Sequence, residues 1–322
     1  MEFYKYLIPE ESIDVRIDNV ATLRKIEGKL RETFTKNNYN EVLMPSFDYV
    51  ELYTQIGCDI PSSNMFRFVD SKGKNVALRY DFTIPLARLY ATKYHDTTSR
   101  FCYFGKVYRK EKVHKGRSSE LFQAGVELIN EPGVRGEQEI LAMLQETVSN
   151  IPLNDILIEF GSAAFLDRLF EITDDDARLQ EILKYRSVSQ LKEFIKEHDF
   201  DEKFSRLLLK LPSAIGGTKM LDEICELVDD KILLDTLIDL KCLIINLEGT
   251  YNYQFDLGMV PEIDYYTGLM IKGYTKNAAK PIITGGRYDK LLPKFDADVS
   301  AVGFCCHLNY VLEALAMEEN ND

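Results

Sequence analysis

The side chains best suited to chemistry lie on one short stretch, where an amide and a carboxylate alternate with apolar residues. In the strand expected over 121–129, Gln123, Gly125 and Glu127 share one face, because successive side chains of a strand point to opposite sides. The other face is apolar and is formed by Phe122, Ala124, Val126 and Leu128. Glycine at position 125 leaves room for a ligand to lie on the sheet. An acid and an amide on this open face suit an ammonium group.

Basic side chains cluster just before this strand, in a chain whose formal net charge is −13. The strand-like run Phe101–Tyr108 and a polar connection over 110–120 precede it, so the region is expected to be a long hairpin. Lys and Arg occur seven times between residues 100 and 117, against one acid, Glu111. Arg109 and Arg117 carry forked guanidinium donors that suit a phosphate or a carboxylate. The alternative is a solvated hairpin with an ordinary polar face.

A second acidic position lies earlier in the chain. A strand expected from Val76 onward places Asp81 and Thr83 on one face by the same alternation, and a helix follows Pro85. Taking a lone carboxylate out of water is costly, whereas a carboxylate that faces a bound ammonium is compensated.

The stretch that carries these residues resembles a known motif. YRKEKVHKGRSSELFQAGVELI resembles motif 2 of the class II aminoacyl-tRNA synthetases, in the version of histidyl-tRNA synthetase. LRYDFTIPLARLYA resembles the histidyl segment that receives the α-ammonium of histidine, and the pair Tyr265–Tyr266 lies in a DYYTG run that resembles the signature lining the imidazole pocket. The resemblance implies histidine-binding roles for Asp81, Thr83, Arg109, Gln123, Glu127, Tyr265 and Tyr266, with Arg109 at the carboxylate end. It also implies an anion- or nucleotide-binding set of Arg109, Glu111 and Arg117.

The tyrosine pair has a plainer alternative, since both rings could be ordinary core aromatics. If the pair lies on a strand, one ring faces the pocket and the other supports it from behind.

Three departures from the histidyl pattern bear on function. Pro261 and Glu262 stand where the family has an arginine and a glycine before the tyrosine pair, and Tyr310 replaces the motif 3 arginine that binds ATP phosphate. Neither Pro261 nor Tyr310 supplies the positive charge that would stabilise an adenylation transition state. The chain also ends without room for the family's anticodon-binding domain. A retained amino-acid pocket without activating charges indicates a sensor or regulator with no catalytic residue of its own.

The whole pattern resembles the regulatory subunits of ATP phosphoribosyltransferase, the first enzyme of histidine biosynthesis. This resemblance implies a non-catalytic chain that activates a short-form catalytic subunit, confers inhibition by histidine, and forms a class II-type dimer within a hetero-oligomer. Two alternatives stay open. One is a truncated histidyl-tRNA synthetase or other amino-acid-adenylating enzyme, and the other is a histidyl-like sensing domain for a different effector.

The helices and strands expected around these residues indicate an α+β fold. Helices would flank an antiparallel sheet, as in the class II synthetase catalytic domain. Apolar residues at spacings of three and four predict a helix from 16 to about 38. A strand over 41–47, with Pro45 at a sheet edge, and a helix from about 49 resemble motif 1, the family's dimer interface. The charge-rich stretch 162–230 is expected to be a helical insertion between core segments 1–161 and 231–322.

Composition argues against several classes of protein. A pI of about 5.0 disfavours broad nucleic-acid binding, so no tRNA partner is expected. Six scattered cysteines form no C-x-x-C pair, and four histidines lack metal-ligand spacing, so we expect reduced thiols and no metal or cofactor. The chain shows no signal peptide and no membrane-spanning run, which favours a cytoplasmic protein.

Overall fold

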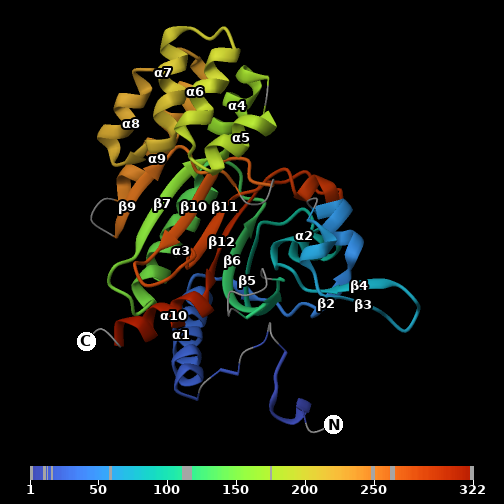
Figure 1. Ribbon diagram of the computed structural model, residues 1–322. Coiled ribbons are helices and arrows are strands. Elements are labelled where there is room, and N and C mark those ends of the chain that lie inside the picture. The colour runs from blue at the N-terminus through green and yellow to red at the C-terminus, as the bar shows by residue number, and fades with distance from the viewer. Residues whose placement is uncertain are drawn as a thin grey trace.

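The computed structural model describes residues 3–9, 12, 14–15, 17–57, 60–110, 118–174, 176–247, 251–261 and 265–319 (Figure 1). Within these residues the chain builds a nine-stranded sheet in the order β1-β5-β6-β12-β11-β10-β7-β9-β8. Its strands are β1 (Asn40–Glu41), β5 (Ser99–Tyr108), β6 (Glu120–Ile129), β7 (Leu157–Ser162), β8 (Ile215–Gly216), β9 (Asn252–Asp256), β10 (Leu269–Tyr274), β11 (Ile283–Arg287) and β12 (Ala301–His307). Neighbours run antiparallel except β1–β5 and β7–β9. The mainly antiparallel α+β fold is confirmed.

Strands β5 and β6 form the long hairpin that the sequence predicts. They pair antiparallel over ten residues each, and this register sets Tyr103 opposite Gly125. Ala124, Val126 and Leu128 are fully buried on the apolar face of β6. The connection at 111–117, with Glu111 and Arg117, lies outside the residues that the structure describes, so their predicted roles stay predictions.

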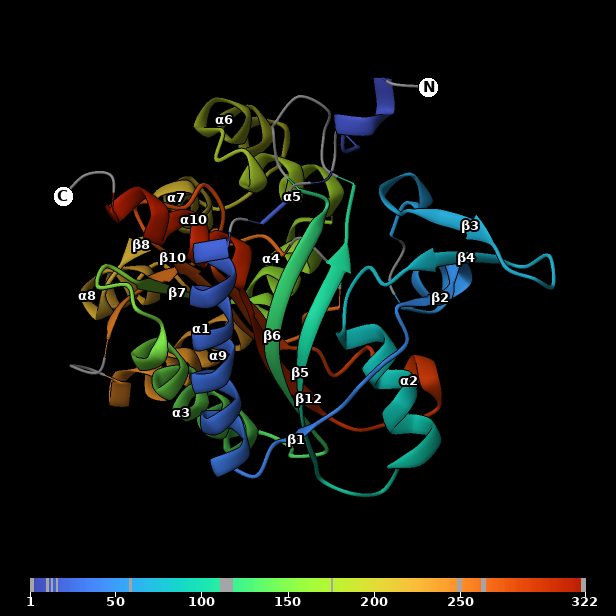
Figure 2. The same cartoon turned by 90° about the horizontal axis from the view of Figure 1, so that it is seen from below.

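Three helices cover the apolar face of β6 and β12. They are α1 (Ile17–Lys36), α3 (Val134–Asn150) and α10 (Leu308–Glu319) (Figure 2). Helix α1 contacts both other helices, α1 and α10 contact β6, and α3 contacts β12. In α1 the residues Leu23, Ile26 and Leu30 are buried at the spacing of three and four that predicts this helix. The Asn309 side chain of α10 accepts a hydrogen bond from the backbone N–H of Phe122 in β6. This bond ties the C-terminal helix to the central hairpin.

A helical unit occupies the chain between β7 and β9, at the top of Figure 1. It contains α4 (Ala163–Thr173), α5 (Asp176–Lys184), α6 (Val188–Glu197), α7 (Glu202–Lys210), α8 (Thr218–Cys225) and α9 (Lys231–Ile244). The guanidinium of Arg186 donates to the Pro212 carbonyl (3.0 Å) and pairs with Asp256 at the end of β9. Helix α9 packs on α4 and α8 of the helical unit and also contacts β7 and α3 of the core. It thus belongs by contact to both parts, and the domain boundary predicted at residue 230 stays a prediction.

The single strand expected over 41–47 is wrong. The chain instead leaves the large sheet after β1 and enters a second sheet, ordered β2-β4-β3, through β2 (Phe47–Tyr49), β3 (Arg67–Val69) and β4 (Asn75–Leu78). Pro45 lies between the two sheets, where its missing N–H costs no ladder bond. The helix expected from about 49 is present over 50–57, and its Leu52–Gly57 part is π-helical. Helix α2 (Thr83–Lys93) follows β4 and lies beside the small sheet (Figure 1).

The remaining short helices are 3-10 turns at Phe3–Tyr6, Ser62–Asn64, Leu211–Ser213, Ile245–Leu247 and Leu292–Phe295. None of the helices in the described ranges is both long and apolar enough to cross a membrane.

Arg79 joins the two sheets, and its replacement tests this junction. Its side chain is 7% exposed and donates to the carbonyls of Met44 (2.9 Å), Pro45 (2.9 Å) and Lys106 (2.8 Å). We expect Arg79→Met to lower the free energy of unfolding by about 2–4 kcal/mol, because three backbone carbonyls lose the charged donor that a buried side chain supplies. Urea denaturation measures this change. The exposed Arg67→Met serves as the control and should change stability by less than about 0.5 kcal/mol; equal losses would contradict the role of Arg79.

Candidate functional site

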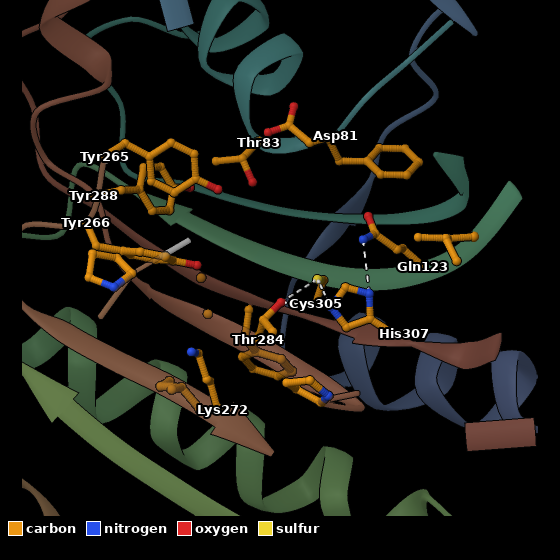
Figure 3. Close-up of a pocket in the computed structure, with 18 of the residues that line it drawn as sticks. Asp81, Thr83, Gln123, Tyr265, Tyr266, Lys272, Thr284, Tyr288, Cys305 and His307 are labelled. Atoms are coloured by element: carbon orange, nitrogen blue, oxygen red, sulfur yellow. Dashed lines mark hydrogen bonds between the residues drawn. The ribbon is translucent and has the colours of Figure 1, made fainter. Parts of the chain in front are cut away.

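Sheet register places residues of five adjacent strands in one row, and four of these strands contribute a polar side chain. Tyr103 of β5 lies opposite Gly125 of β6, which lies opposite Cys305 of β12; Thr284 of β11 and Lys272 of β10 continue the row. Residues directly opposite one another across a sheet point to the same face. These side chains therefore line one cavity of about 460 Å³, on the face opposite the apolar side of β6. Figure 3 shows this pocket.

The polar face of β6 is buried beneath other groups, and Gly125 does not hold a ligand as predicted. A Cβ at position 125 would collide with the phenol ring of Tyr103 and with the Phe304 carbonyl oxygen (2.8 Å). The missing side chain makes room for Tyr103, which stacks on Phe82 with ring centroids 4.2 Å apart. Alternation along β6 does not show which residue of the neighbouring strand β5 fills the space beside Gly125.

Glu127 is the most enclosed acid of the pocket. Its side chain is 2% exposed, and its Oε1 accepts hydrogen bonds from Thr83 Oγ1 (2.9 Å) and the Tyr103 hydroxyl (3.5 Å). Its Oε2 accepts from the Tyr288 hydroxyl (2.5 Å) and lies against Gly303, where any Cβ would overlap the carboxylate. Burial raises the pKa of Glu127 to about 7, although the donors from Tyr288 and Thr83 lower it.

Asp81 lies just before α2 and is also buried, at 3% exposure. Its Oδ1 accepts from the Ile84 backbone N–H (3.3 Å), whereas its buried Oδ2 has no hydrogen-bond partner. Burial raises the pKa of Asp81 to about 6, against the lowering effect of Arg109. Strand β4 ends at Leu78 and α2 begins at Thr83, so the strand face predicted for Asp81 and Thr83 is wrong. The two side chains meet the pocket from a helix N-terminus instead.

Tyr265 and Tyr266 lie in the turn before β10 and not on a strand, so their side chains need not point to opposite sides. Tyr265 and Tyr266 both line the cavity, with ring centroids 5.0 Å apart in an edge-to-face arrangement. Tyr288 adds a third ring, 5.6 Å from that of Tyr265. Figure 3 shows the three rings together at one end of the pocket. This aromatic wall suits a flat, apolar-faced group.

Four cations line the same cavity. They are Arg109, Lys110, Lys272 and Lys280. The Nε of Arg109 donates to the Tyr80 carbonyl (2.9 Å), which fixes the guanidinium against the start of α2. Lys280 Nζ lies 5.8 Å from the centre of the Tyr310 ring. The pocket thus combines a buried acidic pair with basic side chains, a charge arrangement that suits a zwitterion.

The amide nitrogen of Gln123 faces a histidine, a pairing that the sequence did not predict. Gln123 Nε2 lies 3.3 Å from His307 Nδ1, and His307 Nε2 lies 2.8 Å from Thr284 Oγ1. Burial, together with Arg109 and Lys280, lowers the pKa of His307 to about 3, so the ring is neutral at physiological pH. The register His307↔Gln123 explains this pairing of residues that are far apart in sequence.

The structure thus brings all seven sequence-predicted binding residues to one cavity: Asp81, Thr83, Arg109, Gln123, Glu127, Tyr265 and Tyr266. Their binding of histidine stays a prediction. Sequence reasoning assigned no binding role to Tyr103, Lys272, Lys280, Thr284, Tyr288 and His307. Alternation of Gly303, Cys305 and His307 along β12 is the one sequence signal that could have placed His307 on the pocket face. In the described part of the chain, no group of three His, Cys, Asp or Glu side chains could hold a metal ion.

Comparison with known proteins places this geometry in a family. The family model described as histidyl-tRNA synthetase matches residues 13–311. An ATP phosphoribosyltransferase regulatory subunit from Lactococcus lactis is 41% identical over 329 residues, with 100% of both chains covered. A crystal structure of an ATP phosphoribosyltransferase regulatory subunit/histidyl-tRNA synthetase from Bacillus halodurans has a TM-score of 0.87 at 26% identity and covers 97% of this chain and 84% of that one. A solved ATP phosphoribosyl transferase complex from Thermotoga maritima shares the fold, with a TM-score of 0.69, 16% identity, and coverage of 89% and 97%.

The raised pKa of Glu127 predicts a specific pH dependence of stability. The unfolded chain loses this proton near pH 4.5 and the folded chain near pH 7, so the free energy of unfolding falls as pH rises between these values. Glu127→Gln removes this titration. Between pH 5 and pH 8 the wild type should therefore lose on the order of 3 kcal/mol relative to the variant in urea denaturation.

Glu120→Gln on the same strand is the matched control, because Glu120 pairs with Lys106 outside the cavity. That variant should keep the wild-type slope. Parallel pH profiles for Glu127→Gln and wild type would show that Glu127 does not titrate in this range.

Proposed function

Because the chain belongs to the family of ATP phosphoribosyltransferase regulatory subunits, we propose that its pocket binds histidine and that occupancy controls the catalytic chain. ATP phosphoribosyltransferase catalyses the first step of histidine biosynthesis, and histidine is the end product of that pathway. Transfer of phosphoribosyl from PRPP to ATP then takes place on the partner. A cytoplasmic location is part of the proposal, in keeping with the free cysteines of the described residues.

The acidic pair carries the proposal. Asp81 Oδ2 is buried without a partner, and a buried polar atom left unsatisfied costs about 1–3 kcal/mol or more when charged. An α-ammonium seated between Asp81 and Glu127 would supply the missing donor and neutralise two carboxylates whose pKa values burial raises. Thr83, already bonded to Glu127, lies beside the same position.

The rest of the pocket suits the other two parts of histidine. Arg109 is held at the cavity by Tyr80 and would meet the α-carboxylate, for which a guanidinium is well shaped. The rings of Tyr265, Tyr266 and Tyr288 would enclose the imidazole. A zwitterion with a flat side chain thus satisfies the acidic, basic and aromatic parts of one cavity.

The lack of catalysis by this chain is also our proposal. Pro261 and Tyr310 both line the pocket, where the histidyl pattern has arginines. A preorganised charge typically contributes about two to three orders of magnitude in rate, so two such losses leave little adenylation. Histidine would bind without being activated.

We further propose two protein partners. The name of the Lactococcus lactis relative identifies it as a regulatory subunit, and the Thermotoga maritima structure of this fold is a complex; these support a catalytic-subunit partner. For self-association, Leu43, Phe47 and Tyr49 are 88%, 49% and 53% exposed in the segment that resembles motif 1. Exposed apolar patches of this kind mark protein interfaces.

The decisive experiment mixes this protein with a short-form ATP phosphoribosyltransferase from the same genome and follows phosphoribosyl-ATP formation. Activity should depend on the mixture, and histidine should suppress it. Asp81→Asn should weaken histidine binding in calorimetry by about 100-fold, because the ammonium loses a charged acceptor, and should abolish feedback.

Asp96→Asn provides the control, since Asp96 is exposed beyond the end of α2. It should behave as the wild type. Unchanged transferase activity on adding this protein would contradict the regulatory role, and histidine-dependent ATP–pyrophosphate exchange by the chain alone would contradict the lack of catalysis.

Dimerisation is tested by Leu43→Asp. A charge at a buried interface position is costly, so light scattering after size exclusion should show a shift from dimer to monomer. Tyr185→Asp places a charge at a 70% exposed residue of the helical unit and should leave the dimer intact. A dimer that survives Leu43→Asp would show that this segment does not form the interface.

A further inference from the structure

His307 and Thr284 form a hydrogen-bonded chain behind Gln123 that the proposed function does not use. His307 Nδ1 faces Gln123 Nε2 at 3.3 Å, and His307 Nε2 faces Thr284 Oγ1 at 2.8 Å. Figure 3 shows the Gln123 amide nitrogen directed to His307 and its oxygen directed away, on the side where Asp81 lies. The orientation of this amide decides whether an acceptor or a donor faces the acidic end of the pocket.

We propose that His307 is a positioning residue whose Nε2–H tautomer holds the Gln123 carbonyl toward the α-ammonium of the bound amino acid. The proposal rests on the proposed function for the ligand. Gln123 would then contact the ammonium as a third acceptor beside Asp81 and Glu127. His307 and Thr284 would act only through Gln123.

Donor and acceptor accounting fixes the tautomer. A neutral imidazole has one N–H and one acceptor nitrogen, and the amide NH₂ of Gln123 needs the acceptor at Nδ1. The proton must therefore be on Nε2, which donates to Thr284 Oγ1. The Thr284 hydroxyl remains able to donate to Cys305 Sγ, 3.4 Å away. Every group in the chain is satisfied in this arrangement.

The other tautomer would exchange the donor and the acceptor that the Gln123 amide presents to the pocket. With the proton on Nδ1, the Gln123 carbonyl would have to turn toward His307 and the NH₂ would face the ligand. A donor would then oppose the N–H groups of the ammonium. Neutrality of the ring is essential to this choice, and burial keeps the pKa of His307 at about 3, far below physiological pH. Thr284 supports this choice, because its hydroxyl accepts from Nε2–H, and a valine at 284 would remove that acceptor.

The tautomer is measured directly by nuclear magnetic resonance of the imidazole nitrogens in histidine-labelled full-length protein. His307→Phe assigns the signal among the four histidines of the chain. We expect a neutral ring protonated at Nε2, with and without ligand. A ring protonated at Nδ1 would overturn the proposal, and this readout does not depend on whether histidine binds.

A matched pair of variants tests the consequence for binding. Thr284→Val removes the acceptor at nearly constant volume and should move the proton to Nδ1, whereas Thr284→Ser keeps the hydroxyl and the Nε2–H tautomer. In calorimetry, Thr284→Val should lose about 10- to 100-fold in affinity for histidine. Its affinity for imidazole propionate, which lacks the α-amino group, should stay within about twofold of the wild type.

Equal losses for histidine and imidazole propionate would show that Thr284 contacts or shapes the ligand site in general, and would overturn the positioning role. A Thr284→Ser variant that loses as much as Thr284→Val would do the same. If the wild type binds neither ligand, the proposed function fails and the contact of Gln123 with an ammonium fails with it, whereas the tautomer is still decided by the spectrum.

Discussion

The burial of the Glu127 carboxylate is the constraint on which the pocket depends. An ionised carboxyl is stable inside a protein only when donors or a counter-charge replace its water. Three hydroxyls, from Thr83, Tyr103 and Tyr288, supply part of this compensation from three separate elements. Glycine at 303 leaves the space that Oε2 occupies. The large sheet, the N-terminus of α2 and the segment after β11 must therefore be placed together before this one side chain can be accommodated.

Even with these donors the acid remains poorly compensated, because its pKa stays near 7 and the neighbouring Asp81 keeps an unpartnered oxygen. Two buried carboxylates with too few donors suit a bound cation. Arg109 at the same cavity offers the opposite charge, so a ligand that carries both charges satisfies groups that the protein leaves unbalanced. Binding of such a ligand would stabilise the folded chain. Regulation of a partner would also require the ligand to bind one state of the complex more tightly than the other.

The helical unit shares a segment with this pocket. Asp256, at the end of β9, pairs with Arg186 of the helical unit, and the Leu257 N–H donates to the Ala214 carbonyl (3.1 Å). A few residues later, Met259 and Pro261 line the cavity. Proline at 261 therefore both removes a charge from the pocket and continues the connection that anchors the helices to the sheet. The proposed amino-acid pocket of this synthetase-like scaffold thus has Pro261 where the histidyl pattern has an arginine.

The sequence by itself determined the elements whose signals are local. Periodicity placed α1 and the β5–β6 hairpin, and motif spacing collected the seven residues that line one cavity. Tertiary structure decided what each of them faces. Gly125 accommodates Tyr103, Gln123 pairs with His307, and Asp81 approaches from a helix N-terminus, because each of these contacts depends on cross-strand register or on the placement of α2. Alternation tells which face of a strand a residue occupies, but the partner strand lies up to 184 positions away in the sequence and leaves no local trace.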